Sequence, residues 1–436
     1  MTRMFARRIA VVGTGYVGLT TGACLASLGH RVVCADVDQL KVARLRAGQV
    51  DILEPGLAEL VVEGQAAGRL EFVVGAAAAV ADAEVVFFCL PTPMGAGGAA
   101  DLSAVESVAA EISDVLPYGA IIVTKSTVPV GTSGRVRALL GREDVAVVSN
   151  PEFLREGTAV RDFLHPDRIV VGSDSPSAAE RVAALFAKLG APTVLMDAAS
   201  AEMVKYAANC FLAMKLSYVN AVAELCELLG ADIESVSEGM GYDKRIGQSF
   251  LRPGPGWGGS CLPKDTHAMV QIAEAVGVDF GLIRSTIEAN VRAQLRIVDK
   301  VRAACGGSLA GVRIGVLGLA FKAGTNDLRD SPALAVAEQL VLDGAELTAF
   351  DPEVTGPVAG MLLVDDPYQA VKGAEAVVLL TDWPVFRTLD WTRVAELMDG
   401  HVIVDARNHL DADALARAGL LHSGVGRASL GVTQFS

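Results

Sequence analysis

A glycine-rich turn near the N-terminus constrains the fold of this chain more than any other feature. Residues 8–12 have the apolar pattern of a short buried strand, and Gly13-Thr-Gly-Tyr-Val-Gly18 follows directly. A helical pattern runs from about residue 16 to 28, Gly29 ends it, and residues 31–36 predict a second strand ending in Asp36. A strand, a glycine turn, a helix and a strand with an acidic end form the dinucleotide-binding fingerprint.

Each glycine of this turn has its own predicted task. Gly13 permits the tight turn, Gly15 lets the backbone approach a pyrophosphate, and Gly18 lets the helix pack closely on the strand. The helix N-terminus supplies N–H groups to the phosphates. Asp36 is expected to accept hydrogen bonds from the adenosine ribose, and an acid there disfavours the extra phosphate of NADP. We therefore predict NAD as the cofactor; a sharp strand–helix turn without a ligand is the alternative.

Buried apolar runs separated by helical patterns continue along the chain and predict βα repeats with parallel sheets. The runs lie at residues 85–90, 120–125, 145–149, 169–172, 312–317, 346–350, 376–380 and 401–405. Between the two sets, residues 200–229 are helical in pattern, residues 247–263 are rich in Gly and Pro, and residues 264–304 are again helical. We predict an α/β chain of two Rossmann-like parallel-sheet domains joined by a central long-helix region, with bounds 1–198, 199–305 and 306–436.

Composition narrows the class of protein further. The net charge of −14 argues against nucleic-acid binding through a basic surface. No C-x-x-C motif occurs, so we expect neither a disulfide framework nor a metal site, and mostly reduced cysteines. Arg7-Arg8 before an uncharged stretch to residue 29 resembles a twin-arginine signal, but the glycine turn explains that stretch better. We therefore predict a cytoplasmic protein that binds no membrane. The cysteines are Cys24, Cys34, Cys89, Cys210, Cys226, Cys261 and Cys305.

The segment Gly258-Gly-Ser-Cys-Leu-Pro-Lys-Asp265 predicts a reactive cysteine. Two glycines allow close backbone approach before Cys261, which is expected just ahead of, or at, a helix start. The helix dipole and Lys264 would stabilise a thiolate there, and a thiolate attacks an aldehyde readily. Cys261 alone would suit a buried packing role, but packing requires neither the glycines nor the Lys-Asp pair.

Several further motifs appear in order along the chain. They are Lys125-Ser-Thr-Val-Pro129, Asn150-Pro-Glu-Phe-Leu-Arg-Glu156, Lys205-Tyr-Ala-Ala-Asn209 and Phe321-Lys-Ala-Gly-Thr-Asn-Asp-Leu-Arg329. With the glycine turn and the cysteine segment, the chain resembles the UDP-glucose/GDP-mannose dehydrogenase family from about residue 8 to 411. The resemblance implies an NAD-dependent four-electron oxidation of a sugar-nucleotide C6 alcohol to a carboxylate, through a thiohemiacetal and a thioester on Cys261.

The resemblance also implies catalytic roles for particular residues. Lys205 and Asn209 lie four residues apart on one helical face and would stabilise an alkoxide and an oxyanion. Asp265 and Glu152, with Thr127, would position water or relay protons. Without the motifs, Lys205 would be a solvated helix lysine and Glu152 a carboxylate near a helix start.

Binding residues follow from the same resemblance. Those expected at the cofactor are Gly13, Gly15, Tyr16, Val17, Gly18, Asp36, Lys41, Thr92, Thr127, Glu156, Lys264 and Arg329. Those expected at the substrate are Glu152, Phe153, Leu154, Arg155, Glu156, Lys205, Asn209, Arg245, Phe250, Leu251, Arg252, Gly258, Lys322 and Arg407. Arg245 is the candidate for a residue that reaches across a dimer interface.

Some alternatives stay open. UDP-glucose is the expected substrate, while Arg252-Pro-Gly254 and Trp257 leave dTDP-glucose and GDP-mannose as alternatives. A non-catalytic regulator that binds NAD and sugar nucleotides, or a two-electron hydroxyacid dehydrogenase, would share the glycine turn. The latter would need neither the cysteine nor a second α/β domain. We expect a homodimer or larger homo-oligomer, with the helix at 200–230 as its core.

Overall fold

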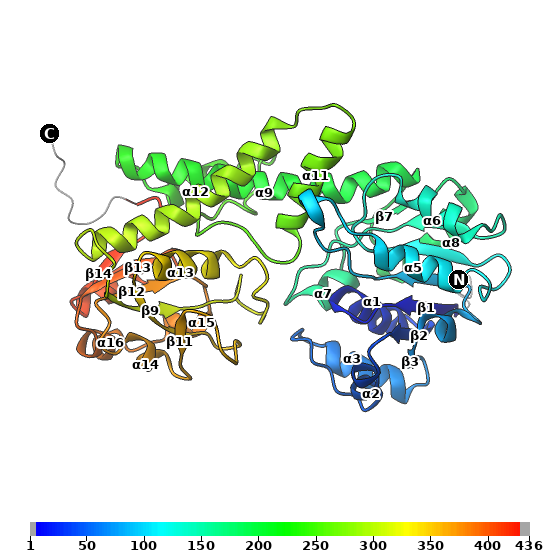
Figure 1. The fold of residues 1–436 in the computed structure, drawn as a ribbon, viewed down its shortest axis with the longest axis horizontal. Helices are drawn as coiled ribbons and strands as arrows, with labels where there is room; N and C mark the ends of the chain where they lie inside the picture. Colours follow the sequence, from blue (N-terminus) through cyan, green and yellow to red (C-terminus); the bar gives the residue numbers. More distant parts are fainter. Residues whose placement is uncertain (1–5, 428–436) are drawn as a thin grey trace. The chain divides into compact units, whose positions relative to one another are not determined.

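The computed structural model describes residues 6–427 and divides into two compact units that meet between Ala208 and Asn209. We call them the N-terminal and C-terminal units. Each contains a sheet covered by helices on both faces (Figure 1). This confirms the predicted α/β class with two Rossmann-like sheets and a long central helix, whereas the exact domain bounds stay a prediction.

The N-terminal unit has an eight-stranded sheet in the order β3-β2-β1-β4-β5-β6-β7-β8. Its strands are β1 (Arg8–Val12), β2 (Arg31–Asp36), β3 (Leu70–Val74), β4 (Val85–Phe88), β5 (Ile121–Thr124), β6 (Ala146–Ser149), β7 (Ile169–Gly172) and β8 (Thr193–Met196). Its helices are α1 (Tyr16–Ser27), α2 (Gln39–Arg46), α3 (Leu57–Ala66), α4 (Ala76–Val80), η1 (Ala96–Gly98), α5 (Ser103–Ile112), α6 (Thr132–Leu140), α7 (Ala159–Leu164), α8 (Pro176–Ala183) and η2 (Ala184–Leu189).

One strand pair of this sheet departs from the predicted parallel arrangement. β6 and β7 pair antiparallel, with Ser149 opposite Gly172, whereas the other strand pairs of the sheet are parallel. A buried apolar run looks the same in either direction, so the sequence pattern does not encode strand direction.

The C-terminal unit has a six-stranded sheet in the order β11-β10-β9-β12-β13-β14, parallel throughout its pairs. Its strands are β9 (Arg313–Leu317), β10 (Glu346–Phe350), β11 (Met361–Leu363), β12 (Ala376–Leu379), β13 (Val402–Asp405) and β14 (Leu421–Ser423). The helices around it are α13 (Pro332–Leu342), α14 (Pro367–Val371), α15 (Pro384–Arg387), α16 (Trp391–Leu397) and α17 (Ala412–Arg417). The central helices are α9 (Ala198–Leu229), α10 (Ile233–Gly241), α11 (Leu262–Ala275) and α12 (Gly281–Ala304).

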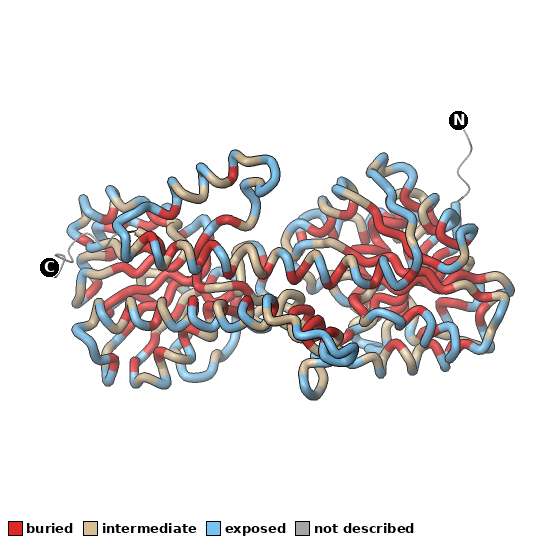
Figure 2. The backbone as a smooth tube through the Cα atoms, turned by 90° about the horizontal axis from the view of Figure 1, so that it is seen from above, coloured by how far each residue is buried: buried red, intermediate tan, exposed pale blue. Residues whose placement is uncertain are grey.

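The cores lie on the faces of the sheets, where the strands are buried (Figure 2). In β1, Ile9 and Val11 belong to one hydrophobic cluster, while Ala10 and Val12 belong to another. Successive side chains of a strand point to opposite faces, so one continuous apolar run fills two cores. This burial fixes the carboxyl ends of the strands, where the predicted ligand-binding residues lie.

Candidate functional site

The turn after β1 has the geometry that the fingerprint predicts. Gly13 has a φ of +94°, and its N–H donates to the carbonyl oxygen of Ala35 at 2.8 Å. A Cβ on Gly18 would lie 1.8 Å from the Gly13 oxygen, so only glycine fits there. A Cβ on Gly15 would have no heavy atom within 4 Å, which leaves that backbone open to a ligand. The turn therefore fits a dinucleotide phosphate group.

Asp36 ends β2 beside this turn and is an ionised acceptor. Its carboxylate accepts hydrogen bonds from the Thr14 backbone N–H at 3.0 Å and from Lys41 Nζ at 3.1 Å. Partial burial by itself would raise the pKa of Asp36, but the hydrogen bonds from Thr14, Asp38 and Lys41 outweigh it and lower the pKa to about 2. This arrangement fits a ribose hydroxyl donor and brings the predicted Asp36 and Lys41 together.

Tyr16 and Val17 take up structural contacts beside the turn. Val17 packs against the hydrophobic core. The Tyr16 hydroxyl donates to Glu54 and accepts a hydrogen bond from the Gly157 N–H at 2.9 Å. The Tyr16 hydroxyl is thus engaged by groups within the N-terminal unit. Sequence reasoning did not single out Glu54, because a lone carboxylate before Pro-Gly carries no local signal.

A buried ion pair links α9 to the segment after β6. Lys205 Nζ donates to Glu152 Oε1 at 2.8 Å, and the Leu154 N–H donates to Glu152 Oε2 at 2.6 Å. Burial alone would raise the pKa of Glu152, but the charge and hydrogen bond of Lys205 lower it, so the carboxylate is ionised. Lys205 Nζ also lies 5.4 Å from the centre of the Phe153 ring. Two predicted catalytic groups are therefore in direct contact.

A second buried lysine, without a role in the sequence analysis, lies close by. Lys125 follows β5, and its Nζ donates to Asn150 Oδ1 at 3.1 Å, while Asn150 Nδ2 donates to the Val170 carbonyl at 2.7 Å. Burial lowers the pKa of Lys125. These contacts hold the start of the segment that carries Glu152. A lysine at the carboxyl end of an apolar strand was the available sequence signal.

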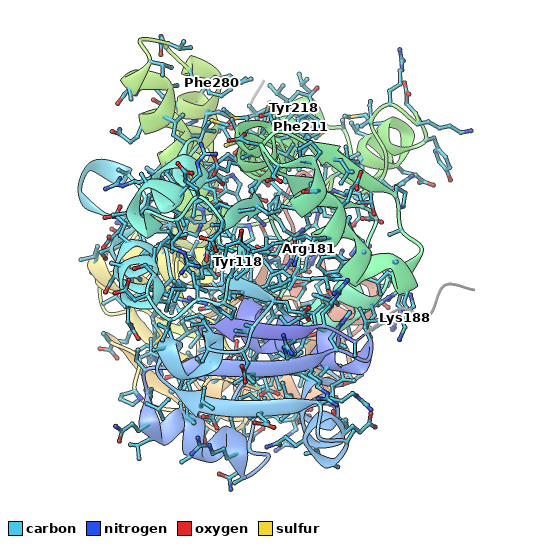
Figure 3. All side chains as sticks on the ribbon, turned by 90° about the vertical axis from the view of Figure 1, so that its right-hand side faces the viewer. Tyr118, Arg181, Lys188, Phe211, Tyr218 and Phe280 are labelled. Carbon is cyan, nitrogen blue, oxygen red and sulfur yellow. The ribbon has the colours of Figure 1, made fainter. Side chains whose placement is uncertain are left out.

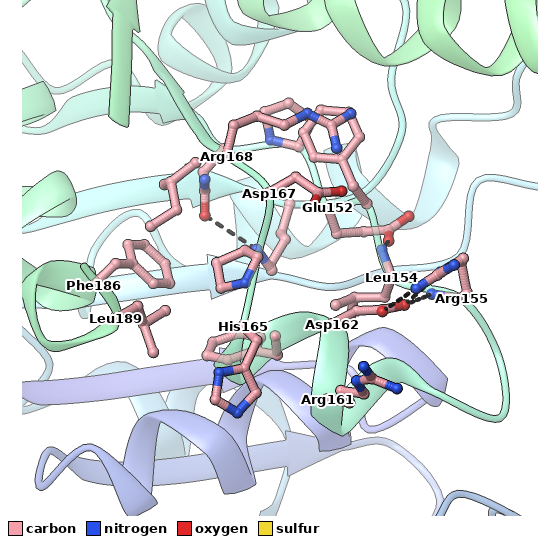
Figure 4. A pocket seen from close by; sticks show the side chains of 17 residues that line it. Glu152, Leu154, Arg155, Arg161, Asp162, His165, Asp167, Arg168, Phe186 and Leu189 are labelled. Atoms are coloured by element: carbon pink, nitrogen blue, oxygen red, sulfur yellow. Dashed lines mark hydrogen bonds and ion pairs between the residues drawn. The ribbon is translucent and has the colours of Figure 1, made fainter. Parts of the chain in front are cut away.

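Lys125 and Glu152 line a cavity of about 440 Å³ beside this segment (Figure 4). The cavity wall contains Phe153, whose ring lies 3.5 Å below the Arg168 guanidinium. Arg155 also lines it and forms an ion pair with Asp162 at 2.6 Å. The mixture of paired charges and aromatic rings suits a polar ligand.

Thr92 and Thr127 are also brought together. Both are buried, and the Thr92 hydroxyl donates to the Thr127 carbonyl oxygen at 2.9 Å. Glu156 lies half-buried in the segment that carries Glu152. Thr92, Thr127 and Glu156 thus lie in the segments that follow the carboxyl ends of β4, β5 and β6.

The reactive-cysteine segment forms a second cluster, within the C-terminal unit. Cys261 is the N-cap residue of α11 and is partly exposed, and its carbonyl accepts a hydrogen bond from the Asp265 N–H at 3.0 Å. The Asp265 side chain is buried and accepts from Asn209 Nδ2 and from Lys264 Nζ, each at 2.5 Å. The Lys264 ammonium is therefore placed on Asp265, and its predicted effect on the thiol stays a prediction.

The predicted substrate loop packs against the end of β13. The Arg407 guanidinium donates to the carbonyls of Leu380 and Phe321, and a Cβ on Gly254 would lie 3.2 Å from Arg407 Nη1. Burial lowers the pKa of Arg407. A Cβ on Gly258 would lie 2.0 Å from the Asp330 carbonyl, so this glycine is required by packing.

The remaining predicted substrate and cofactor residues vary in exposure. Leu251 is buried, Phe250 has a φ of +63°, and Lys322 is half-buried. Arg245 and Arg329 form ion pairs with Asp243 and Asp327 and are 88% and 66% exposed, and Arg252 is exposed. Their predicted roles at the substrate, the cofactor and a dimer interface stay predictions.

Trp257 and most of the cysteines have packing roles. The Trp257 indole is buried and donates to Ser217 Oγ at 2.9 Å, so its presence carries no information about the nucleotide base. The seven cysteines form no disulfide bond, and Cys261 and Cys305 are the two that are not fully buried. Between residues 6 and 427, the structure contains no helix that combines the length and apolarity needed to cross a bilayer. The same residues contain no group of three His, Cys, Asp or Glu side chains that could hold a metal ion.

Comparison with known proteins assigns all three parts of the chain to one family. Models of the UDP-glucose/GDP-mannose dehydrogenase family match at residues 7–190 (NAD binding domain), 199–292 (central domain) and 315–412 (UDP binding domain). The predicted NAD cofactor and the predicted resemblance are thereby confirmed.

Individual relatives agree with this assignment. The chain is 44% identical to a UDP-glucose 6-dehydrogenase of Rhizobium meliloti, over 96% of this chain and 99% of that protein. It is 42% identical to the UDP-glucose 6-dehydrogenase TuaD of Bacillus subtilis, over 98% and 95%. A UDP-glucose dehydrogenase structure from Pyrobaculum islandicum superposes with a TM-score of 0.89 at 36% identity, covering 98% and 99%. The chain therefore belongs to the UDP-glucose/GDP-mannose dehydrogenase family and is an NAD-dependent dehydrogenase.

Proposed function

We propose that the protein oxidises the C6 hydroxymethyl group of UDP-glucose to the carboxylate of UDP-glucuronate. The observation that carries the proposal is the partly exposed residue Cys261 at the N-cap of α11, whose first turn also carries Asp265 of the buried Asn209–Asp265 pair. Sequence identities of 44% and 42% to two UDP-glucose 6-dehydrogenases, over 96% and 98% of this chain, support the choice of substrate. Overall, one alcohol, one water and two NAD⁺ give one carboxylate, two NADH and three protons.

NAD, when bound at the glycine turn beside Asp36, supplies an acceptor for each of the two hydrides. The chain's own residues then determine the chemistry at carbon. Loss of the hydroxyl proton and of a first hydride converts C6 to an aldehyde. The Cys261 thiolate adds to this aldehyde with a new C–S bond, and protonation of the oxygen gives a thiohemiacetal. Loss of the hydroxyl proton and of the second hydride from C6 leaves a thioester. Water attacks the thioester, the C–S bond breaks, and Cys261 regains its thiol.

The Lys205–Glu152 pair is suited to the charged steps. Because its neighbours keep Glu152 ionised, this carboxylate can accept a proton from the substrate hydroxyl or from water. The Lys205 ammonium, buried beside it, can stabilise negative charge that develops on C6 oxygen. Thr127, held through its carbonyl by Thr92, would position the water.

The Asn209–Asp265 pair is suited to oxyanion stabilisation. The Asn209 amide nitrogen carries two hydrogens, and Asp265 accepts one of them. The second is then oriented and can face the oxyanion of the tetrahedral intermediates. Asp265 thus positions the Asn209 amide of α9 against the first turn of α11.

The sugar nucleotide would be held by backbone and basic groups. We assign its diphosphate and sugar to Phe250, Leu251, Arg252, Gly258, Lys322 and Arg407, together with the segment Glu152–Glu156. Bidentate guanidinium groups match phosphate oxygens, and the acidic protein needs such local cations.

The test is a count of NADH formed per sugar consumed, with UDP-glucose, dTDP-glucose and GDP-mannose compared. Two NADH per UDP-glucose supports the proposal; one would identify a two-electron dehydrogenase, and none a binding protein. We expect Cys261→Ser to lower carboxylate formation by more than about a hundredfold, because a hydroxyl is a far weaker nucleophile than a thiolate. Cys305→Ser, at the other partly exposed cysteine, is the matched control and should keep full activity. Full activity of Cys261→Ser would contradict the thioester route.

We further propose a homodimer formed through α9. Phe211, Tyr218 and Leu225 recur every seven residues, so they share one helix face, and each is more than half exposed. Phe211 and Tyr218 are labelled in Figure 3. Light scattering should give twice the mass of the chain, and Tyr218→Glu combined with Leu225→Glu should give a monomer. A monomeric wild-type protein would contradict this proposal.

A further inference from the structure

We propose that Glu54 and the Tyr16 hydroxyl form a positioning pair that fixes residues 155–160 to the dinucleotide turn. Its kinetic consequence rests on the proposed function, since residues 152–156 are assigned to the nucleotide sugar. Neither Glu54 nor the Tyr16 hydroxyl has a part in the chemistry described above.

The Glu54 side of the pair is rigidly held. Glu54 lies just before α3, and its carbonyl accepts a hydrogen bond from the Leu57 N–H at 3.1 Å. Leu57 and Val61 of α3 are fully buried in the core of the N-terminal unit. The Glu54 residue itself is only 6% exposed.

The Tyr16 side is equally fixed. Tyr16 is the first residue of α1, and Leu19 and Ala23 of that helix are buried in the same core. Its hydroxyl donates to Glu54 Oε2. Burial, followed by the hydrogen bond and charge of Glu54, raises the pKa of Tyr16 far above its ordinary value, so the hydroxyl stays a neutral donor.

The segment that these two groups hold is a loop, whose Arg155 and Thr158 side chains also bond to Asp162 of α7. Residues 150–158 form neither helix nor strand. The Gly157 N–H donates to the Tyr16 hydroxyl oxygen at 2.9 Å, and the Val160 N–H donates to Glu54 Oε1 at 3.3 Å. The pair thus ties the end of this loop and the start of α7 to the turn after β1.

The chemistry of the pair favours positioning over simple packing. A buried carboxylate is costly unless it is hydrogen-bonded, and an apolar side chain would fill the same space at a lower cost. What the carboxylate adds is direction, since its two oxygens accept from the hydroxyl and from the Val160 N–H. Without the Tyr16 hydroxyl, the Gly157 N–H loses its acceptor.

Tyr16→Phe removes this acceptor while keeping the ring. We expect the KM for UDP-glucose to rise about tenfold, which corresponds to one hydrogen bond to a charged network. The NAD dissociation constant should change less than about twofold, because phosphates meet the backbone of the turn and not the hydroxyl. Hydrogen exchange of the peptide covering residues 151–160 should become faster. Tyr118, labelled in Figure 3, is 90% exposed. Tyr118→Phe is therefore the control and should change none of these three quantities.

Tyr16→Phe also leaves the Glu54 carboxylate short of a donor, so the melting temperature should fall. Tyr16→Phe combined with Glu54→Gln removes the buried charge, so most of the melting temperature should return while KM and exchange stay raised. If KM and exchange return to wild-type values with the melting temperature, or never change in Tyr16→Phe, the positioning role is wrong. If the wild type forms no NADH from UDP-glucose, the proposed function fails instead, and hydrogen exchange alone decides the positioning pair.

Discussion

The two sheets of this protein share a frame and use it differently. Their strand orders correspond, β3-β2-β1-β4-β5-β6 in the N-terminal unit and β11-β10-β9-β12-β13-β14 in the C-terminal unit. A glycine of positive φ directly follows β1 and β9, Gly13 at +94° and Gly318 at +92°. The Gly13 N–H donates to the Ala35 carbonyl of β2, and the Gly318 N–H donates to the Phe350 carbonyl of β10, each at 2.8 Å.

The two units differ in the surroundings of one acidic residue, which is Asp36 at the end of β2 and Asp351 directly after β10. Asp36 is partly exposed beside an open glycine turn, whereas Asp351 is buried. Asp351 Oδ2 accepts from the N–H groups of Leu319 and Ala320 and from Trp383 Nε1. In the N-terminal unit a helix starts directly after the turn, whereas in the C-terminal unit residues 319–331 intervene before α13. The same acid position therefore lies beside an open glycine turn in one unit and braces a loop in the other.

The largest expected effect concerns the glycines of the N-terminal turn. Gly18→Ala places a Cβ 1.8 Å from the Gly13 oxygen, so we expect more than about 3 kcal/mol of destabilisation and loss of NAD binding. Gly15→Ala meets no atom within 4 Å, so stability should stay within about 0.5 kcal/mol while NAD binding weakens at least about tenfold. For each variant, thermal unfolding measures the change in stability and NAD titration measures the change in NAD affinity. Wild-type NAD affinity in Gly15→Ala would break the assignment of this turn to the cofactor.

A smaller effect separates the two acids. Asp351→Asn replaces a buried acceptor that also receives the Glu353 N–H at 3.0 Å, so we expect a loss of about 1–3 kcal/mol with unchanged NAD affinity. Asp36→Asn should show the reverse, a loss of about 1 kcal/mol or less and a roughly tenfold weaker NAD complex. Equal effects of the two substitutions on NAD affinity would contradict the division of roles.

The smallest effect is a pH dependence of stability that Asp36 should contribute. The folded-state pKa of Asp36 is lowered to about 2, below its ordinary value, so its contribution to stability is present above about pH 4 and lost as the pH falls toward 2. Because Asp36 is partly solvated, the contribution should be about 1 kcal/mol or less. Urea unfolding at pH 5 and pH 3 should therefore show a smaller acid loss in Asp36→Asn than in the wild type. An identical loss of stability in the two proteins would mean that other carboxylates, and not Asp36, cause the loss in acid.

The strands that sequence patterns did not predict share one property. β3 and β8 are the edges of the N-terminal sheet, and β11 and β14 are the edges of the C-terminal sheet. Each residue of β8, β11 and β14 is exposed or half-buried, and β3 mixes buried with more exposed residues, in contrast to the fully buried central strands β4 and β12. An edge strand is covered less, so it needs no continuous apolar run and leaves no such signal in the sequence.

Local chemistry was readable from the sequence alone. The glycine turn, the acid that ends β2, the start of α11 at Cys261 and the long helix α9 all depend on neighbouring residues, whose spacing and conformational preferences are written in order along the chain. The NAD cofactor and the reactive cysteine were predicted from these features.

Tertiary structure alone decided which of these groups touch. The pairs Lys205–Glu152, Asn209–Asp265 and Tyr16–Glu54 join residues separated by 53, 56 and 38 positions. It also decided the antiparallel direction of β7 and turned Asp351 inward. The physical reason is that local periodicity specifies which face of an element is buried, whereas the partner that meets this face is selected only when distant elements pack together.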